Sequence, residues 1–317
     1  MHVYYELPRT PLNLEQNIAL SIGTFDGAHR GHQLLIETLR REAQSRKLAP
    51  AVLTFQDMPY CFFRPDACPH LLTLPDEKIQ AFAPLNLEHL FIVPFNDSIA
   101  QQSARQFADT LARNIAMKLL VVGPDFALGR GREGDVATLS ILGQEMGFDV
   151  VVLDEKLLEE NAPISSTRVR ECVEAGQIED AARLLGRSFV LSGQVVSGQQ
   201  LGRQIGVPTI NIQPHARKVL PRNGVYAVRA FLNEGAISHR AVLNIGVRPT
   251  VNGVRQSIEF HIIGETIETP PQQARVEFIA RLRDEQKFPN LDALVAQIKK
   301  DIAQANTVLG AELNVGA

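Results

Sequence analysis

Residues 21–32 read Ser-Ile-Gly-Thr-Phe-Asp-Gly-Ala-His-Arg-Gly-His, and this stretch decides the fold of the first half of the chain. A short apolar run at residues 18–20 precedes it, as is typical of a buried parallel strand. Residues 33–47 follow it with the pattern of an amphipathic helix. A strand, a glycine-rich turn and a helix in succession direct backbone N–H groups and the positive end of the helix to one place. The stretch therefore predicts a phosphate site.

Two histidines, His29 and His32, lie in this turn, and three glycines let the backbone approach a ligand closely. The pattern resembles the His-x-Gly-His signature of the nucleotidylyltransferase superfamily, and this resemblance implies that both histidines contact nucleotide phosphates and stabilise charge as pyrophosphate leaves. A helix entry with two solvent-exposed histidines is the alternative that the pattern leaves open. The other residues of the turn that we expect to bind the nucleotide are Gly23, Phe25, Asp26 and Gly27.

Length, composition and charge limit the classes of protein to which the chain can belong. Its 317 residues are enough for about two domains, and 45% hydrophobic residues predict a packed core. The net charge is -3 and no long basic run occurs, which argues against nucleic acid as the main partner. No apolar run approaches the ~18 residues that a membrane span requires, so we expect no membrane contact.

The three cysteines favour a reducing compartment. Cys61, Cys68 and Cys172 form no metal-ligand pattern, and any disulfide scheme leaves one of them unpaired. Residues 1–17 are polar and contain prolines, unlike a signal peptide. We therefore expect a cytoplasmic protein.

Strand and helix patterns alternate through the first half of the chain. Apolar runs predict further strands at residues 51–55, 90–93, 119–122 and 150–153, and residues 103–117 and 136–146 have helical patterns. Such alternation predicts an α/β, Rossmann-like domain with a parallel sheet. Ligands of such sheets bind beyond the carboxyl ends of the strands, where the first and fourth predicted strands both lead into glycine-bearing loops.

Two further segments could contact phosphates. Residues 123–135 contain four glycines and two arginines, which predicts a mobile basic loop, with an ordinary exposed loop as the alternative. We expect Asp125 in this loop to contact the nucleotide. Residues 164–168 read Ile-Ser-Ser-Thr-Arg before a helical pattern.

Hydroxyl residues at that position are helix-capping signals, and capping alone is one interpretation. The functional interpretation is a second phosphate site formed by Ser165, Ser166, Thr167 and Arg168. Together with His29, this site would close a clamp on a triphosphate and stabilise departing pyrophosphate.

The pattern changes after residue 186. Short strand-like runs occur at residues 189–196, 224–232, 241–246, 257–263 and 274–282, which predicts a closed antiparallel β-barrel. A final helix follows Pro289, with Asn290 as its cap. We expect two domains, 1–186 and 187–317. The predicted buried stripe of the final helix is Leu291, Leu294, Val295, Ile298 and Ile302.

The second domain carries motifs that resemble those of riboflavin kinases. They are Gly-Gln-Val-Val-Ser-Gly at 193–198, Gly-Arg-Gln-Ile-Gly-Val-Pro-Thr-Ile-Asn at 202–211, Gly-Val-Tyr-Ala-Val at 224–228, Asn-Ile-Gly-Val-Arg-Pro-Thr at 244–250, Glu-Phe-His at 259–261, and Arg-Leu-Arg-Asp-Glu-Gln-Lys-Phe at 281–288. The turn at 23–32 and the segment at 164–168 resemble the FMN adenylyltransferase module. The chain as a whole thus resembles the bifunctional bacterial riboflavin kinase/FAD synthetase family.

This resemblance implies two reactions. The barrel would transfer the γ-phosphoryl group of ATP to the 5′-hydroxyl of riboflavin, which gives FMN. The first domain would transfer AMP from a second ATP to FMN, which gives FAD and pyrophosphate. Both reactions would require Mg²⁺, and the partners would be the small molecules riboflavin, FMN and ATP.

The residue chemistry of the barrel motifs agrees with a kinase. Thr209 and Asn211 lie two residues apart and face one side of an extended segment, where their oxygens suit Mg²⁺. A polar turn after Pro208 is the alternative. Glu259 is the candidate base for the riboflavin hydroxyl, and an outward-facing strand residue is the alternative. The remaining candidates are Gly198, Gly202 and Gly206 for nucleotide, and Phe62, Phe126, Arg283 and Glu285 for flavin.

Some positions depart from the family pattern. Ala28 replaces a usual valine, the segments 56–59 and 125–129 lack a usual histidine, arginine and phenylalanine, and residues 263–270 replace the usual segment after Glu259. These departures leave two alternatives open: an FMN adenylyltransferase with a weak or inactive kinase domain, and a flavin-binding regulatory protein. A class I aminoacyl-tRNA synthetase ranks far lower, because no Lys-Met-Ser-Lys-Ser motif follows the histidine turn.

Overall fold

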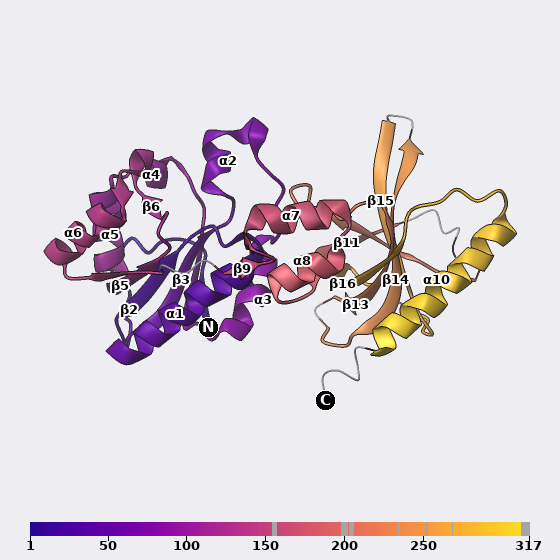
Figure 1. Cartoon of the computed structure of the whole chain (residues 1–317), viewed down its shortest axis with the longest axis horizontal. Coiled ribbons are helices and arrows are strands. Elements are labelled where there is room, and N and C mark those ends of the chain that lie inside the picture. The colour runs from indigo at the N-terminus through magenta and orange to yellow at the C-terminus, as the bar shows by residue number, and fades with distance from the viewer. Residues whose placement is uncertain are drawn as a thin grey trace. The chain divides into compact units, whose positions relative to one another are not determined.

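The structure is a computed structural model, and it describes the chain except for residues 154–156, 198–201, 203–205, 234, 251–252, 268 and 312–317. The chain divides into two compact units, Met1–Ser166 and Thr167–Ala317 (Figure 1). Each unit has a fold of its own.

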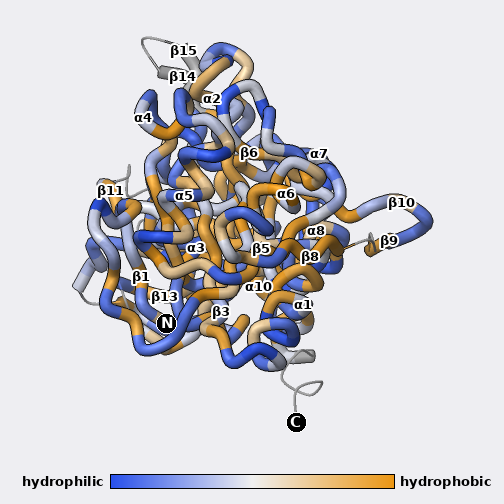
Figure 2. The backbone as a smooth tube through the Cα atoms, turned by 90° about the vertical axis from the view of Figure 1, so that its left-hand side faces the viewer, coloured by the Kyte–Doolittle hydropathy of each residue, from blue (hydrophilic) through white to orange (hydrophobic). Residues whose placement is uncertain are grey.

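A six-stranded sheet forms the centre of the first unit. Its strand order is β1-β4-β3-β2-β5-β8, and every neighbouring pair is parallel, which confirms the predicted Rossmann-like sheet. The edge strand β1 is too short to have been predicted. Hydrophobic residues gather in the central strands, while the connecting loops are largely hydrophilic (Figure 2). The strands are β1 (His2–Tyr4), β2 (Ile18–Ile22), β3 (Ala49–Phe55), β4 (His89–Val93), β5 (Met117–Val122) and β8 (Asp149–Val152).

Helices cover both faces of this sheet. Helices α1 (Arg30–Arg46) and α3 (Pro75–Phe82) pack on one face, and α5 (Ala104–Asn114) and α6 (Val136–Met146) pack on the other. The predicted helix at 103–117 ends early, because Ala116 has a positive φ of 53° and Met117 already begins β5. The short helices are α2 (Pro59–Phe63), α4 (Asp97–Ala100), η1 (Asp26–Ala28), η2 (Pro65–Ala67), η3 (Ala83–Leu85) and η4 (Arg130–Arg132).

A disulfide closes the connection between β3 and α3. Cys61 and Cys68 are bonded to each other, whereas Cys172 is a free thiol. The sequence analysis favoured a reducing compartment and did not anticipate this pairing. The loop that the bond closes contains the exposed Phe62 and Phe63 of α2, and the bond restrains a segment that the sequence showed only as proline-broken.

The second unit contains the predicted closed barrel. Its six strands follow the order β11-β12-β15-β14-β13-β16 with antiparallel pairing. The sequence missed β12, because a polar motif occupies its first residues. Helices α7 (Ser166–Ala175) and α8 (Ile178–Leu185) precede the barrel. The barrel strands are β11 (Phe189–Val196), β12 (Ile210–Pro214), β13 (Gly224–Leu232), β14 (His239–Thr250), β15 (Gly253–Ile262) and β16 (Gln273–Arg283).

The final helix α10 (Leu291–Ala311) packs along the barrel (Figure 1). Asn290 caps it as predicted, since its Oδ1 accepts a hydrogen bond from the Ala293 amide at 2.9 Å. The predicted stripe is wrong at Leu291, which is 52% exposed, because the tightest packing lies further along the helix, at Ala305 and Leu309. Among the described residues, no helix combines the length and the apolar character that crossing a bilayer requires.

Two small hairpins border the sheet of the first unit. One pairs β9 (Leu158–Glu159) with β10 (Ala162–Pro163), and the other pairs β6 (Ala127–Leu128) with β7 (Gly134–Asp135). The β6–β7 loop is anchored more firmly than its glycines predict. The Arg130 amide donates to the Gln102 carbonyl, and the Glu133 carboxylate accepts from the Ala104 amide, each at 2.8 Å.

Gly129 is the point of closest approach in this loop. It has a φ of 80°, and a Cβ there would lie 2.5 Å from the backbone nitrogen of Ala104. Gly131 has a φ of 64°, but a Cβ there would meet no atom within 4 Å.

We expect Gly131→Ala to cost about 1 kcal/mol of unfolding free energy through backbone strain alone. We expect Gly129→Ala to cost at least ~3 kcal/mol, because strain and a backbone clash add. Urea unfolding of both variants checks this; equal losses would contradict it.

Candidate functional site

The turn after β2 has an unusual backbone. Phe25, Gly27 and Ala28 have positive φ values of 47°, 82° and 41°. Such conformations store strain in the non-glycine residues and persist only where surrounding contacts fix them. The turn is fixed on one side by the Gly23 amide, which donates to the Leu53 carbonyl of β3 at 3.1 Å. It leads directly into α1, which begins at Arg30, three residues earlier than predicted.

The two predicted histidines lie together at the N-terminus of α1. His29 caps the helix, and its Nδ1 accepts a hydrogen bond from the His32 amide at 3.4 Å. The two imidazole rings stack with centroids 3.6 Å apart, and the Phe25 ring contacts His32 edge-on at 5.1 Å. Both rings therefore lie where the partial positive charge of the helix end favours an anion.

The Asp26 side chain is engaged within the protein. Its buried carboxylate accepts hydrogen bonds from the amides of Leu72 and Thr73 at 2.9 and 3.0 Å, and from the Thr73 hydroxyl at 3.3 Å. The Gly27 amide in turn donates to that hydroxyl at 3.0 Å. These contacts shape the turn; a direct contact of Asp26 or the buried Phe25 with nucleotide stays a prediction.

The second predicted phosphate motif meets the first one. The Ser166 hydroxyl donates to the Asp26 carbonyl at 2.8 Å, and a Cβ on Gly31 would lie 3.5 Å from the Ile164 carbonyl oxygen. Ser165 precedes this contact and is half-buried. Thr167 and Arg168 belong to the second unit, so their approach to His29 stays a prediction.

Aromatic side chains surround the carboxyl ends of β3 and β4. Phe55 ends β3, and its ring contacts Phe95, which follows β4, at 5.4 Å. Phe62 on α2 contacts Phe95 at 5.5 Å and remains 40% exposed. Phe126, beyond β5, packs partly buried against the core cluster, and the neighbouring Asp125 carbonyl accepts from Arg132 at 2.9 Å. A planar ligand could stack on the exposed face of Phe62.

A cavity of about 400 Å³ opens in the second unit. Glu259 on β15 is paired in register with Asn211 on β12 and with Asn244 on β14. Residues directly opposite each other on neighbouring strands point to the same face, so this row lines the cavity together. The Thr209 hydroxyl donates to the Glu259 carboxylate at 3.3 Å. The sequence analysis did not select Asn244, because strand register is not visible in the motif that contains it.

Residues 283–288 form a strap along one wall of this cavity. Arg283 donates from Nε and Nη2 to the Asp301 carboxylate at 2.9 and 2.7 Å. Asp301 is 2% exposed and comes from α10, so a buried ion pair joins the strap to the final helix. Asp301 is a second residue that the sequence analysis missed, because it lies off the predicted stripe of the helix.

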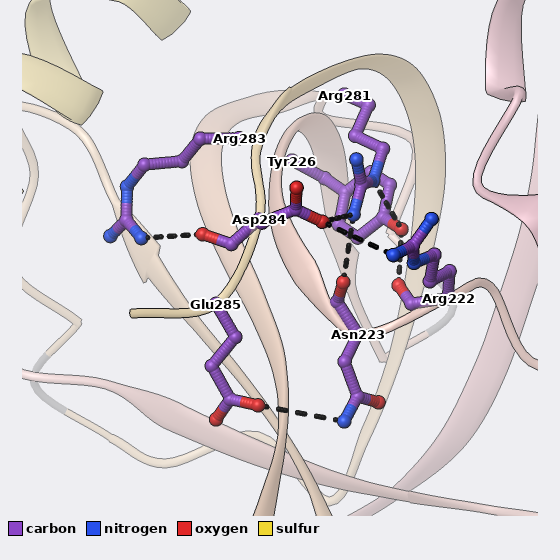
Figure 3. A network of polar contacts seen from close by, with 7 residues as sticks. All are labelled: Arg222, Asn223, Tyr226, Arg281, Arg283, Asp284 and Glu285. Atoms are coloured by element: carbon purple, nitrogen blue, oxygen red, sulfur yellow. Dashed lines mark hydrogen bonds and ion pairs between the residues drawn. The ribbon is translucent and has the colours of Figure 1, made fainter. Parts of the chain in front are cut away.

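Arg281 also holds the first residues of the strap, through Asp284 (Figure 3). Its Nη2 donates to the Asn223 carbonyl at 2.9 Å and to the Asp284 carboxylate at 2.6 Å, and its Nε lies 3.4 Å from the Tyr226 hydroxyl. The hydrogen bond from Arg281 lowers the pKa of the Asp284 carboxyl, while burial raises the pKa of the Tyr226 hydroxyl.

Glu285 follows Asp284 in the strap and lies beside the barrel strands. Its carboxylate accepts a hydrogen bond from the Asn223 amide at 3.5 Å, as Figure 3 shows. A Cβ on Gly246 would lie 2.3 Å from the Glu285 carboxylate, so only glycine at 246 admits this position. The structure thus brings the predicted residues Arg283 and Glu285 to the cavity of Glu259.

The glycines predicted to bind nucleotide differ in their settings. Gly202 lines the cavity, and a Cβ there would lie 2.3 Å from the Val207 carbonyl oxygen and 3.4 Å from the Thr209 hydroxyl. Gly206 has a φ of 77° with open space around it. Gly198 lies outside the described residues.

A second cavity of about 660 Å³ lies on the other side of the Thr209 segment. Thr209 and Asn211 line both cavities. Glu265, Thr266 and Ile267 from the altered segment line only the second one, and His239 Nδ1 lies 2.8 Å from the Glu265 carboxylate. The departure from the family pattern therefore affects the second cavity and leaves the lining around Glu259 intact.

Comparisons with known proteins match both units. The sequence model of FAD synthetase matches residues 12–168, and that of riboflavin kinase matches residues 185–309. The chain is 38% identical over 297 residues to the bifunctional riboflavin kinase/FMN adenylyltransferase of Escherichia coli (strain K12), covering 93% of this chain and 94% of that protein. It is 37% identical over 291 residues to the protein of the same description from Haemophilus influenzae, covering 92% and 94%.

One solved structure resembles the chain along nearly its whole length. It is described as a macrolide-efflux protein from Streptococcus pneumoniae, and it matches with a TM-score of 0.83 and 27% sequence identity over 95% of this chain and 97% of that one. The efflux description belongs to that protein. For this chain, the likeness supports the folds of the two units and their order along the sequence.

The buried ion pair on the strap gives a testable prediction. Asp301→Ala leaves the Arg283 guanidinium uncompensated in a site where it is only 17% exposed, so we expect a loss of about 3 kcal/mol of unfolding free energy. Asp284→Ala removes an exposed partner of Arg281 and serves as the control, with stability close to that of the unchanged chain. Chemical unfolding compares the two; equal stabilities would show that the Asp301 pair does not hold α10.

Proposed function

Since this chain belongs to the bifunctional riboflavin kinase/FMN adenylyltransferase family, we propose that each unit supplies one of the two active sites. The chain is an enzyme that phosphorylates riboflavin to FMN with ATP and then joins FMN to AMP from a second ATP, giving FAD. The observation that supports this most directly is that residues from separate motifs of each reaction meet within one unit. His29 and Ser166 both contact the turn after β2, and Glu259 lies among Thr209, Asn211 and Asn244.

In the first unit, His29 and His32 would stabilise the charge that develops as pyrophosphate leaves. Their position at the helix N-terminus supports this, because backbone N–H groups there act with the two rings on an anion. Gly23 and Gly27 would let the backbone approach the nucleotide, with Asp26 fixing the turn. Ser165, Ser166, Thr167 and Arg168 would contact the phosphates from the second motif, and Asp125 would contact the nucleotide.

In the second unit, Glu259 would accept the proton of the riboflavin 5′-hydroxyl as that oxygen attacks the γ-phosphorus of ATP. The Thr209 hydroxyl donates a hydrogen bond to this carboxylate. Asn211 and Asn244 lie opposite Glu259 on the two neighbouring strands, so polar groups flank the proposed base on the cavity wall. Gly198, Gly202 and Gly206 would approach the phosphates. The altered segment does not line the cavity of Glu259, but it lines the second cavity together with Thr209 and Asn211, so a weak kinase stays the alternative.

The Mg²⁺ that such a transfer uses fits the oxygens of Thr209 and Asn211. Among the described residues, no group of three or more histidines, cysteines or carboxylates could hold a metal ion. A hard cation with few protein ligands suits this setting, since Mg²⁺ keeps waters and binds substrate phosphates. When bound, it would neutralise the charge that develops on the transferred phosphoryl group.

The flavin would occupy the cavity of about 400 Å³ in the kinase, between the strap and α10. Arg283 and Glu285 would form hydrogen bonds with polar groups of the flavin, and apolar side chains of α10 would contact its ring system. In the adenylyltransferase, Phe62 and Phe126 would contact the isoalloxazine ring.

The functional boundary that we propose is 1–186 for the adenylyltransferase and 187–317 for the kinase. It is supported by the family matches, which end at residue 168 and begin at residue 185. We place the enzyme in the cytoplasm, where ATP and flavin precursors are available, and expect small-molecule partners with no nucleic acid or membrane.

Replacing Glu259 tests the kinase assignment. Glu259→Gln keeps the shape of the side chain but removes the base, so we expect riboflavin phosphorylation to fall at least ~100-fold. FAD formation from supplied FMN should stay unchanged. Glu277→Gln, on β16 and paired with Arg275, is the matched control outside the cavity. Chromatography of riboflavin, FMN and FAD after incubation with ATP and Mg²⁺ gives both rates; undiminished phosphorylation in Glu259→Gln would rule out the assignment.

Replacing the histidines tests the adenylyltransferase assignment. His29→Ala and His32→Ala should each lower FAD formation from FMN by roughly 100-fold, while riboflavin phosphorylation continues. His2→Ala is the control, since His2 begins β1 at the opposite end of the sheet. The same chromatographic assay applies, and FAD formation at the unchanged rate in His29→Ala would refute the predicted role.

A further inference from the structure

Lys78 is a buried cation in the first unit that neither proposed reaction uses directly. It lies on α3 and is 2% exposed. Its ammonium donates to the Thr24 carbonyl at 3.0 Å, to the Thr54 hydroxyl at 3.1 Å, and to the Phe55 carbonyl. The three acceptors match the three N–H donors of a lysine ammonium.

These acceptors belong to two neighbouring central strands. Thr24 lies in the turn directly after β2, and Thr54 and Phe55 are the last residues of β3. The Thr54 hydroxyl also donates to the Thr24 carbonyl, at 2.8 Å. One side chain thus joins the carboxyl ends of β2 and β3, at the edge where parallel sheets bind their ligands.

A second link joins the same turn to the beginning of α3. The Asp26 carboxylate accepts from the amides of Leu72 and Thr73, which lie just before this helix. Helix α3 therefore holds the turn at two points, one through Lys78 and one through the segment that Asp26 binds. Between these points lies Phe25, with a positive φ of 47°, so the turn is strained and needs such restraints.

We propose that Lys78 is a positioning residue for adenylyl transfer: by fixing the Thr24 carbonyl to the end of β3, it holds the strained turn that places His29 and His32. This inference rests on the proposed function of the histidine turn. Lys78 acts through the turn and does not touch the reacting groups.

Lys78 carries a buried charge, which is a costly way to make a contact that serves the fold alone. Burial lowers the pKa of its ammonium from 10.5 to about 8, against the opposing effects of Asp26 in the turn and Asp57 after β3. Between pH 8 and pH 10.5, Lys78 binds a proton more often in the unfolded chain than in the folded one. The contribution of Lys78 to the free energy of unfolding therefore rises with pH in this range. Desolvation of the ammonium therefore offsets part of the stability that its three hydrogen bonds contribute at neutral pH.

The variant Lys78→Met in the full chain separates positioning from stability. We expect FAD formation from supplied FMN to fall about 10- to 100-fold, because small displacements of reacting groups have effects of this size. Riboflavin phosphorylation should be unchanged. The melting temperature should change by no more than about 5 °C, because relief of the desolvated ammonium offsets part of the loss of its three hydrogen bonds. Lys118→Met, at an exposed lysine of β5, is the matched control and should alter none of these values. Adenylylation at the unchanged rate, or a parallel loss of melting temperature and both activities, would overturn the proposal.

The pH profile gives a readout that a merely structural role would not change. In the unchanged chain, adenylylation relative to phosphorylation should decline as the pH rises through about 8, where Lys78 loses its proton. That decline should be absent in Lys78→Met. Identical profiles in the two chains would overturn the proposal.

His29→Ala, measured in the same assay, separates this inference from the function on which it rests. If His29→Ala abolishes FAD formation and Lys78→Met does not lower it, only the role of Lys78 fails. If His29→Ala has no effect, the assignment of the adenylylation site fails, and the Lys78 proposal falls with it.

Discussion

The contacts of the Asp26 carboxylate with residues 72 and 73 are the constraint on which the first active site depends. The turn after β2 adopts positive φ values at residues that are not glycine, so it has no local preference for its shape. Its geometry is set by distant partners: Leu72 and Thr73 before α3, Ser166 at the start of α7, and the end of β3. A local sequence motif thus becomes a site only when the fold brings these segments to it.

The kinase site depends on strand register in the same way. The proposed role of Glu259 as a base requires that the neighbouring strands present polar groups at the same height and on the same face. The antiparallel pairing places Asn211 on one side of it and Asn244 on the other. A shift of one residue would turn these side chains out of the cavity, so barrel closure specifies the chemistry as much as the motif does.

The sequence predicted the sheet and the barrel, because apolar periodicity is a local signal, and its glycine-rich motifs proposed the site residues. Strands β11 and β13 and helix α6 were predicted with their observed bounds. Short or polar elements such as β1 and β12 escaped, since three residues show no period and a ligand-binding motif hides a strand pattern. Asn244 and Asp301 were missed for a different reason: their importance comes from pairing across the fold, which one sequence does not display.

Both active sites are braced by a buried charge from an element outside the motifs. In the first unit, α3 supplies Lys78, and in the second, α10 supplies Asp301, each almost fully buried. Buried charges contribute little net stability compared with apolar residues of similar size, whereas their hydrogen bonds fix direction closely. Lys78 fixes the Thr24 carbonyl in the turn after β2, and Asp301 fixes the Arg283 guanidinium at the start of the strap. The two folds differ, so the common feature is physical. In each unit, a desolvated ion makes directional hydrogen bonds to a segment of the proposed site. The packed cores of the two units offset the cost in stability of burying that ion.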